Sequence, residues 1–307
     1  MKETEDCFLK VKNQYLNLVK KEKISNKSKK IILKNLKDIY IPISFWINNK
    51  FKKKTKTLFI GLSGGQGAGK TTVSKILKII LKEYFKRKTQ IVSIDDFYKT
   101  SKERYDMSKK INYLFKTRGV PGTHDVSLIK KFFYSIKKKN FKSVMSPKFN
   151  KSLDDRLKSK NWHKINKKPE IVIFEGWCVG AKSQSNFLIK KPINTLEKFE
   201  DINFFWRKYV NNMLKKDYKK IFSNIDYFIF MKVPDFNSVF KWRLLQEVKL
   251  EKTSHFKKKI MSYNEIKRFV MFYERITLQM IKDLSKSASV IMLLNKNHVI
   301  KKALFKN

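Results

Sequence analysis

Apolar residues are concentrated in five short runs separated by polar segments. The runs are Leu58–Ser63, Gln90–Ile94, Ile171–Phe174, Tyr227–Val233 and Val290–Leu294. They are rich in Val, Ile and Phe and are apolar at nearly every position, which is typical of strands buried on both faces of a parallel sheet. The pattern therefore predicts five strands of a parallel sheet, buried on both faces.

Longer segments with apolar residues at helical spacing lie between these runs. In Lys70–Phe85, for example, Val73, Ile76 and Leu77 recur on one helical face. The other predicted helices are Val126–Lys137, Leu196–Phe222, Phe236–Leu250 and Tyr263–Leu284. Strands that alternate with helices in this way predict an α/β fold with a mostly parallel, doubly wound sheet and flanking helices.

The first 57 residues differ from the rest because they are helical in pattern and rich in lysine. We interpret residues 1–57 as a helical extension packed on the core, and residues 58–307 as one domain. The chain contains no long uncharged apolar run, so we expect no membrane span. With no apolar signal region behind the N-terminus and two cysteines, Cys7 and Cys178, we expect a cytoplasmic protein.

One segment after the first predicted strand has the spacing of a phosphate-binding loop. It reads Gly64, Gly65, Gln66, Gly67, Ala68, Gly69, Lys70 and Thr71. Its glycines let successive backbone N–H groups surround a phosphate, and the following helix adds the partial positive charge of its N-terminus. Lys70 would reach the terminal phosphates and Thr71 would ligate Mg²⁺. The segment predicts a bound nucleoside triphosphate.

Carboxylates end two of the other predicted strands. Asp95 and Asp96 follow the second strand, and Glu175 closes the third. The C-terminal tips of parallel strands form the ligand crevice of such a sheet. Asp95 could accept a proton from an attacking hydroxyl, or either aspartate could cap the next turn. Glu175 would hold Mg²⁺ directly or through water.

Two polar loops carry further candidate residues. They span Arg118–Asp125 and Pro147–Arg156, and loops over such sheets commonly bind substrate. Arginine is scarce, with eight of the 71 basic residues. Arginines in motif-like segments therefore suggest a site that needs a bidentate guanidinium. These arginines are Arg118, Arg156, Arg243 and Arg275.

The net charge of +45 admits two interpretations. It could mark a nucleotide-dependent nucleic-acid-binding protein, since lysines release counterions from a polyanion. It could also reflect compositional bias, because the lysines are spread from end to end. No nucleic-acid recognition module is apparent, so we do not expect a specific nucleic-acid partner.

The assembled segments resemble the phosphoribulokinase, uridine kinase and pantothenate kinase superfamily, and within it the D-glycerate 3-kinase family. The resemblance rests on Gly61–Thr72, Ser93–Tyr98, Arg118–Asp125, Phe174–Trp177, Trp206–Asn211, Trp242–Glu247 and Tyr273–Arg275. It implies a P-loop NTPase fold and ATP- and Mg²⁺-dependent phosphorylation of a small hydroxyl compound. In the named family the acceptor is D-glycerate, a hydroxy acid.

The resemblance also implies roles for residues. Asp95, Lys70 and Arg243 would act in catalysis, Thr71 and Glu175 would hold Mg²⁺, and the loop through Thr72 would bind ATP. The residues expected to bind the acceptor are Asp96, Tyr98, Arg118, Thr123, His124, Asp125, Lys151 and Arg156. A lid would span residues 235–262 approximately. One departure concerns Asn150, where the family usually has Asp, and it leaves the identity of the acceptor open.

Overall fold

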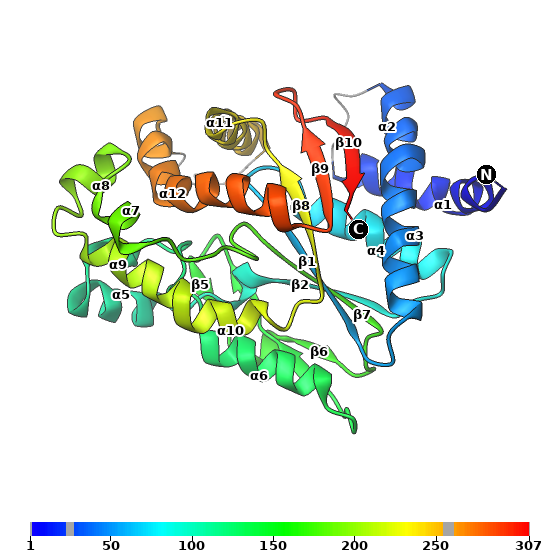
Figure 1. Cartoon of the computed structure of the whole chain (residues 1–307), viewed down its shortest axis with the longest axis horizontal. Helices are drawn as coiled ribbons and strands as arrows, with labels where there is room; N and C mark the ends of the chain where they lie inside the picture. The colour runs from blue at the N-terminus through cyan, green and yellow to red at the C-terminus, as the bar shows by residue number, and fades with distance from the viewer. Residues whose placement is uncertain (1, 23–27, 254–260, 307) are drawn as a thin grey trace.

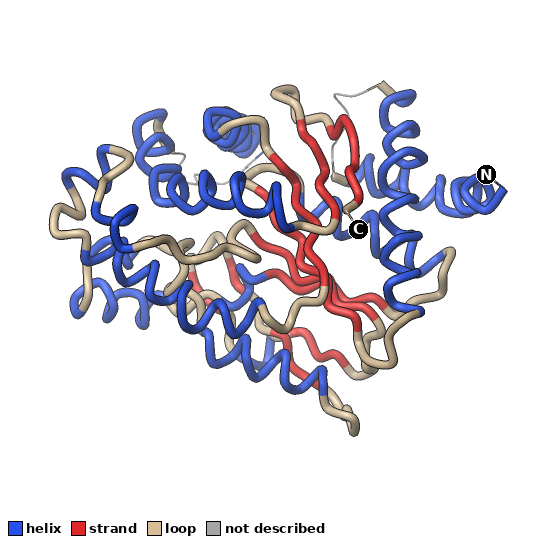
Figure 2. The backbone as a smooth tube through the Cα atoms, in the orientation of Figure 1, coloured by secondary structure: helices blue, strands red, loops and turns tan. Residues whose placement is uncertain are grey.

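A six-stranded sheet forms the centre of the molecule (Figures 1 and 2). The computed structural model describes residues 2–22, 28–253 and 261–306. The strands are β1 (Leu58–Gly64), β2 (Thr89–Ser93), β7 (Ile171–Gly176), β8 (Tyr227–Lys232), β9 (Val290–Leu294) and β10 (Ile300–Phe305). Their order is β10-β9-β8-β1-β7-β2, and all neighbours are parallel except β10 and β9. The prediction of an α/β fold with a mostly parallel sheet is confirmed.

The sheet is buried on both faces because successive strand residues point into different cores. In β1, Phe59 packs into one apolar cluster, whereas Leu58 and Ile60 pack into the other. Side chains alternate in direction along a strand, so an uninterrupted apolar run supplies both clusters. This explains why the four interior strands were recognisable from the sequence; the fifth predicted strand, β2, lies at the edge of the sheet beside β7.

One face of the sheet is covered by helices from the N-terminal part of the chain. These elements are α1 (Lys2–Lys21), α2 (Lys29–Asn35), the π-helix η1 (Leu36–Tyr40), α3 (Ile41–Lys52) and α4 (Lys70–Glu83). Cys7, Val11 and Tyr15 of α1 are buried in the same cluster as Ile76 and Leu77 of α4. Figure 1 shows α1 to α3 beside β10 and α4. The division at residue 57 remains a prediction.

The opposite face is covered by helices from the middle and end of the chain. They are α6 (Val126–Lys137), α8 (Thr195–Phe199), α9 (Phe205–Met213), the π-helix η5 (Leu214–Tyr218), α10 (Lys219–Phe222) and α12 (Tyr263–Ser287). Helix α11 (Phe236–Thr253) contributes Val239 and Trp242 to the cluster of the first face, which contains Leu58 and Ile60. Within the three described segments, no helix has both the length and the apolar character needed to cross a membrane.

The prediction of one continuous helix over Leu196–Phe222 was wrong. Between α8 and α9 the chain turns at Phe204, whose φ of 48° is left-handed. The carboxylate of Asp201 accepts hydrogen bonds from the backbone N–H groups of Trp206 and Arg207 at 2.9 and 3.1 Å. It thereby satisfies donors that a new helix leaves unpaired in its first turn. Apolar spacing continues across this break, which is why the pattern concealed it.

Several elements were not predicted from the apolar pattern. They are η2 (Ile94–Phe97), α5 (Ser101–Lys110), η3 (Tyr113–Lys116), β3 (Val144–Ser146), β4 (Phe149–Asn150), β5 (Asp155–Arg156), η4 (Ser159–Asn161), β6 (His163–Ile165), α7 (Asn186–Lys190) and β10. Most are too short for a periodic signal. Strand β10 is an edge strand whose Lys301 and Lys302 are exposed, so it lacks the continuous apolar run of an interior strand.

Candidate active site

The phosphate-binding loop connects β1 to α4. At Gly64 an added Cβ would lie 2.8 Å from the Cβ of Met231, so the loop begins in close packing contact with β8. Gly69 precedes the first residue of α4 and has a φ of 91°, a left-handed conformation that favours glycine. The N–H groups of the first helical turn have no acceptor within the helix. Residues 64–72 therefore form a donor-rich cradle that fits phosphate oxygens.

Lys70 lies over this cradle. Its Nζ donates to the carbonyl oxygens of Gly64 and Gly65, at 3.0 Å each. Burial lowers the pKa of Lys70, and the neighbouring carboxylates of Glu175 and Asp95 oppose that shift. The lysine is thus positioned between the loop backbone and the carboxylates of the neighbouring strand ends.

Glu175 lies at the C-terminal end of β7, between β1 and β2. Its Cα pairs with Leu62 of β1 on one side and with Ser93 of β2 on the other. Its Oε1 accepts a hydrogen bond from Thr71 Oγ1 at 3.1 Å. Burial raises the pKa of Glu175, whereas the charge of Lys70 lowers it. A hydroxyl and a carboxylate side by side are the oxygen ligands that Mg²⁺ prefers, so this pair fits the expected metal.

Asp95 lies just beyond β2, in η2. Its Oδ1 accepts a hydrogen bond from the Tyr98 hydroxyl at 3.1 Å, and its Oδ2 accepts one from Lys151 Nζ at 3.0 Å. The turn is capped instead by Ser93, whose Oγ accepts from the backbone N–H of Asp95. Burial raises the pKa of Asp95, but the charge of Lys151 and of other basic groups outweighs burial and holds the pKa below its ordinary value. Asp95 is therefore an ionised carboxylate that faces other side chains rather than a helix cap.

Asp96 has a different partner. Its Oδ1 accepts from the backbone N–H of Phe149 at 3.1 Å, and burial raises its pKa. This contact ties η2 to β4, at the start of the turn that carries Lys151.

The loop from Arg118 to Asp125 is closed by its own side chains. Thr123 is fully buried, and its Oγ1 accepts from Gly119 N and donates to Val120 O. Asp125 caps α6 by accepting from Leu128 N at 3.0 Å. In this arrangement both residues shape the loop.

His124 is fully buried behind Tyr98. The two rings stack with centroids 4.3 Å apart, and His124 Nδ1 lies 2.6 Å from the hydroxyl of Tyr218. Burial lowers the pKa of His124 to about 4, so the imidazole is neutral at pH 7. The Tyr218 hydroxyl also accepts from Gly122 N at 3.0 Å. Tyr218 was missed from the sequence, because nothing distinguishes it from the other aromatic residues of its helical segment.

A tight turn presents Lys151. Asn150 Oδ1 accepts from the backbone N–H groups of Ser152 and Leu153 at 2.9 and 3.2 Å. An Asp carboxylate would accept the same two bonds. The departure at Asn150 therefore preserves the turn.

Several known kinases resemble this chain in sequence and in fold. Residues 59–192 match the Phosphoribulokinase / Uridine kinase family. The uncharacterized kinase mug58 of Schizosaccharomyces pombe is 31% identical over 252 residues, which are 78% of this chain and 87% of that protein. The chain belongs to the phosphoribulokinase and uridine kinase family. It is a kinase, a phosphotransferase that acts on an alcohol group.

Two proteins named D-glycerate 3-kinase are also similar to this kinase. The chloroplastic D-glycerate 3-kinase of Arabidopsis thaliana is 30% identical over 251 residues, 76% of this chain but only 52% of that protein. The solved structure of D-glycerate 3-kinase from Cryptococcus neoformans shares the fold, with a TM-score of 0.71 and 20% identity over 87% of this chain and 99% of that one. The expected resemblance to the D-glycerate 3-kinase family is confirmed.

The arginines of this kinase pair with its own carboxylates. The eight pairs are Arg87–Glu170, Arg104–Asp154, Arg118–Asp154, Arg156–Asp125, Arg207–Asp201, Arg243–Glu247, Arg268–Glu200 and Arg275–Glu197. For Arg275, the bidentate contact that the sequence suggested is made within the chain. Arg275 contacts both oxygens of the buried Glu197, at 2.7 and 2.5 Å.

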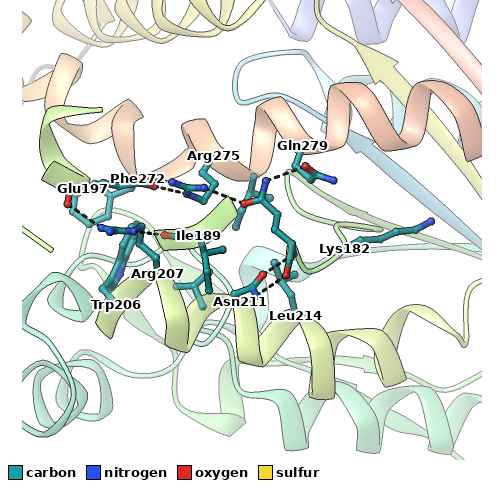
Figure 3. A pocket seen from close by; sticks show the side chains of 13 residues that line it. Lys182, Ile189, Glu197, Trp206, Arg207, Asn211, Leu214, Phe272, Arg275 and Gln279 are labelled. Atoms are coloured by element: carbon teal, nitrogen blue, oxygen red, sulfur yellow. Dashed lines mark hydrogen bonds and ion pairs between the residues drawn. The ribbon is translucent and has the colours of Figure 1, made fainter. Parts of the chain in front are cut away.

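Arg275 lines a small pocket between α9 and α12 (Figure 3). Its other polar walls are engaged as well: Gln184 bonds both Arg275 and Gln279, and Arg207 donates to the carbonyl of Ile189 at 2.9 Å. None of the lining residues belongs to the phosphate loop or to the strand ends that carry Asp95 and Glu175. The pocket is therefore separate from the candidate active site.

Helix α11 occupies the position of the expected lid. Arg243 pairs with Glu247, and its guanidinium lies 5.5 Å from the ring centre of Phe269 in α12. Trp242, which the sequence reasoning did not assign, lies against the phosphate loop, since a Cβ at Gly67 would be 3.1 Å from the Trp242 Cβ. Residues 254–260 of the expected lid lie outside the described residues.

Tyr273 and Trp177 fix the backbone of the Arg118–Asp125 loop. The Tyr273 hydroxyl donates to the carbonyl of Arg118 at 3.1 Å, and Trp177 Nε1 donates to the carbonyl of Gly119 at 3.0 Å. The two rings meet edge to face, with centroids 4.8 Å apart. Both residues lay in segments that carry the family resemblance, which was the available signal for them.

Proposed function

We propose that this kinase transfers the γ-phosphoryl group of ATP to a hydroxyl of D-glycerate, or of a closely similar small hydroxy acid. The observation that carries the proposal is the carboxylate of Asp95. It is ionised and partly exposed, at 26% of its side chain. It also lies one strand away from Glu175 and close enough to Lys70 for the charges to interact. The 30% identity to a plant protein named D-glycerate 3-kinase supports the choice of acceptor.

In this proposal the loop and Lys70 hold the phosphates. The first-turn N–H groups and the ammonium group stabilise the charge on the transferring phosphoryl group. Thr71 and Glu175 would hold Mg²⁺, which, when bound, neutralises negative charge on the phosphate oxygens. Asp95 accepts the proton of the acceptor hydroxyl as its oxygen attacks phosphorus.

A panel of acceptors tests the identity of the substrate. ADP release would be measured by a coupled assay with ATP, Mg²⁺ and either D-glycerate, related hydroxy acids, pantothenate or uridine. We expect acceptor-dependent release that is fastest with D-glycerate. Clear turnover with pantothenate or uridine, and none with D-glycerate, would reject the proposed acceptor.

Replacement of the proposed base tests the mechanism. We expect Asp95→Asn to lower kcat by about 10²–10⁴-fold, the usual contribution of general base catalysis, while ATP still binds. Asp106→Asn is the matched control, because Asp106 is an exposed aspartate on α5. Near-normal turnover of Asp95→Asn would remove Asp95 from this role.

A further inference from the structure

The proposed base is already engaged in an ion pair. Lys151 Nζ lies 3.0 Å from Asp95 Oδ2, and the Tyr98 hydroxyl occupies Oδ1 at 3.1 Å. An oxygen that holds an ammonium proton is poorly placed to receive the proton of a hydroxyl. Asp95 therefore needs Lys151 to leave before Oδ2 can act on an acceptor.

The turn around Lys151 is fixed by hydrogen bonds and ion pairs, whereas the ammonium group of the Lys151 side chain is free to move. Asn150 fixes the turn that follows Lys151, and Asp154, at the end of that turn, pairs with Arg104 and Arg118. The side chain of Lys151 is nevertheless 66% exposed, whereas that of its partner Asp95 is 26% exposed. The flexible lysine stem lets the ammonium group exchange one carboxylate for another without movement of the turn.

Other basic groups of the site are committed elsewhere. Arg118 pairs with Asp154 and lies over the ring of Phe149, with 5.3 Å between guanidinium carbon and ring centre. Arg156 pairs with Asp125 and is 13% exposed. Among the basic side chains described around Asp95, Lys151 thus combines exposure with direct contact to the base.

His124 and Lys70 are equally unsuited to hold an acceptor anion. His124 is fully buried and neutral at pH 7, because burial lowers its pKa to about 4. Lys70 is held by the carbonyl oxygens of the phosphate loop. An anionic group that reaches the Asp95 carboxylate therefore meets the exposed ammonium group of Lys151 there.

We propose that Lys151 selects acceptors that carry a carboxylate. This inference rests on the proposed function and names how its substrate class is recognised. The acceptor carboxylate takes the ammonium group of Lys151 and so releases Asp95 Oδ2 toward the hydroxyl. A bond then forms between the hydroxyl oxygen and the γ-phosphorus, the bond from that phosphorus to ADP breaks, and the hydroxyl proton moves to Oδ2. A neutral acceptor leaves the Lys151–Asp95 pair closed.

The test compares D-glycerate with its neutral amide, D-glyceramide, at pH 7. The two share their hydroxyl groups and differ in the charge that Lys151 would recognise. For the wild type we expect kcat/KM to favour the acid by about 10- to 100-fold, the range for one charge-assisted hydrogen bond. Lys151→Met should reduce this acid-to-amide ratio to near unity, because the acid loses its partner and the amide no longer faces a closed pair.

Two further variants complete the comparison. Lys151→Arg keeps the positive charge and should keep a preference for the acid. Lys158→Met removes an exposed lysine near the end of the same loop and should leave the ratio unchanged.

The outcomes separate this inference from the proposed function. Absence of turnover with D-glycerate in the wild type rejects the function itself. Wild-type turnover of D-glycerate, together with a Lys151→Met variant that loses activity equally toward acid and amide, rejects only the selection by Lys151. An unaltered ratio in Lys151→Met rejects it as well.

Discussion

Gly119 is a position where one added methyl group should disturb the site measurably. Its φ is 139°, and a Cβ there would lie 2.2 Å from the Tyr273 Oη and 2.6 Å from two carbons of the same ring. The Tyr273 side chain cannot easily move away, because it is 2% exposed and packs against Trp177. Gly119→Ala must therefore shift the loop, the ring or both.

Three contributions determine how much stability Gly119→Ala should lose. A side chain in this backbone conformation, which residues other than glycine rarely adopt, costs about 1–3 kcal/mol. Overpacking of a buried contact adds about 1–3 kcal/mol, and loss of the Tyr273 bond to Arg118 about 0.5–1.5 kcal/mol. We expect Gly119→Ala to lower the free energy of unfolding by about 2.5–7.5 kcal/mol, a large share of the roughly 5–15 kcal/mol of an ordinary domain.

Urea denaturation of the variant and the wild type provides the measurement. Tyr273→Phe is the control, since it removes the closest atom and should cost only about 0.5–1.5 kcal/mol by itself. The double variant should recover part of the loss from Gly119→Ala, because the 2.2 Å contact is gone. If the free energy of unfolding of Gly119→Ala lay within about 1 kcal/mol of the wild-type value, the close contact would be refuted, because the expected loss is larger.

Two further predictions concern the turn that carries Lys151. Asn150→Asp should leave the melting temperature and the acceptor KM within about twofold of the wild type, because either side chain accepts the bonds from Ser152 and Leu153; a tenfold change in KM would instead place Asn150 against the substrate. Lys151→Met should move the acid limb of the pH profile of kcat/KM to higher pH, because Asp95 must be ionised to act and Lys151 is a main cause of its lowered pKa. If the acid limb of the Lys151→Met profile stayed at the wild-type pH, Lys151 would not lower the pKa of Asp95.

The five parallel strands and the phosphate loop could be predicted from residue pattern because their signals are local. An apolar run buried on both faces, or glycines followed by lysine and threonine, carries its meaning within a few residues. The edge strand β10 and the break at Phe204 gave no such signal. Both depend on what lies alongside them: β9 in one case, and the capping carboxylate of Asp201 in the other.

For the side chains of the candidate site, too, the sequence predicted some features and only the structure showed others. The sequence placed Asp95 and Glu175 at strand ends, and it left open whether Asp95 is a base or a cap. In the structure Ser93 caps the turn, and the carboxylate of Asp95 instead contacts Lys151, which lies 56 residues further along the chain. Spacing cannot reveal such a pair, because the two residues meet only when the turn after β4 folds over the end of β2.

The sequence by itself determined the fold class and the position of the phosphate loop, because both arise from short-range hydrophobic pattern and backbone chemistry. Only the tertiary structure decided which charged side chains remain available to contact a ligand. Scarce arginines suggested a site that needs a bidentate guanidinium, and each of the eight pairs with a carboxylate of the chain itself. The exposed cation beside Asp95 is a lysine that looks like any other in the sequence. Electrostatic pairing depends on distance in space and on burial, and neither is written in the order of residues.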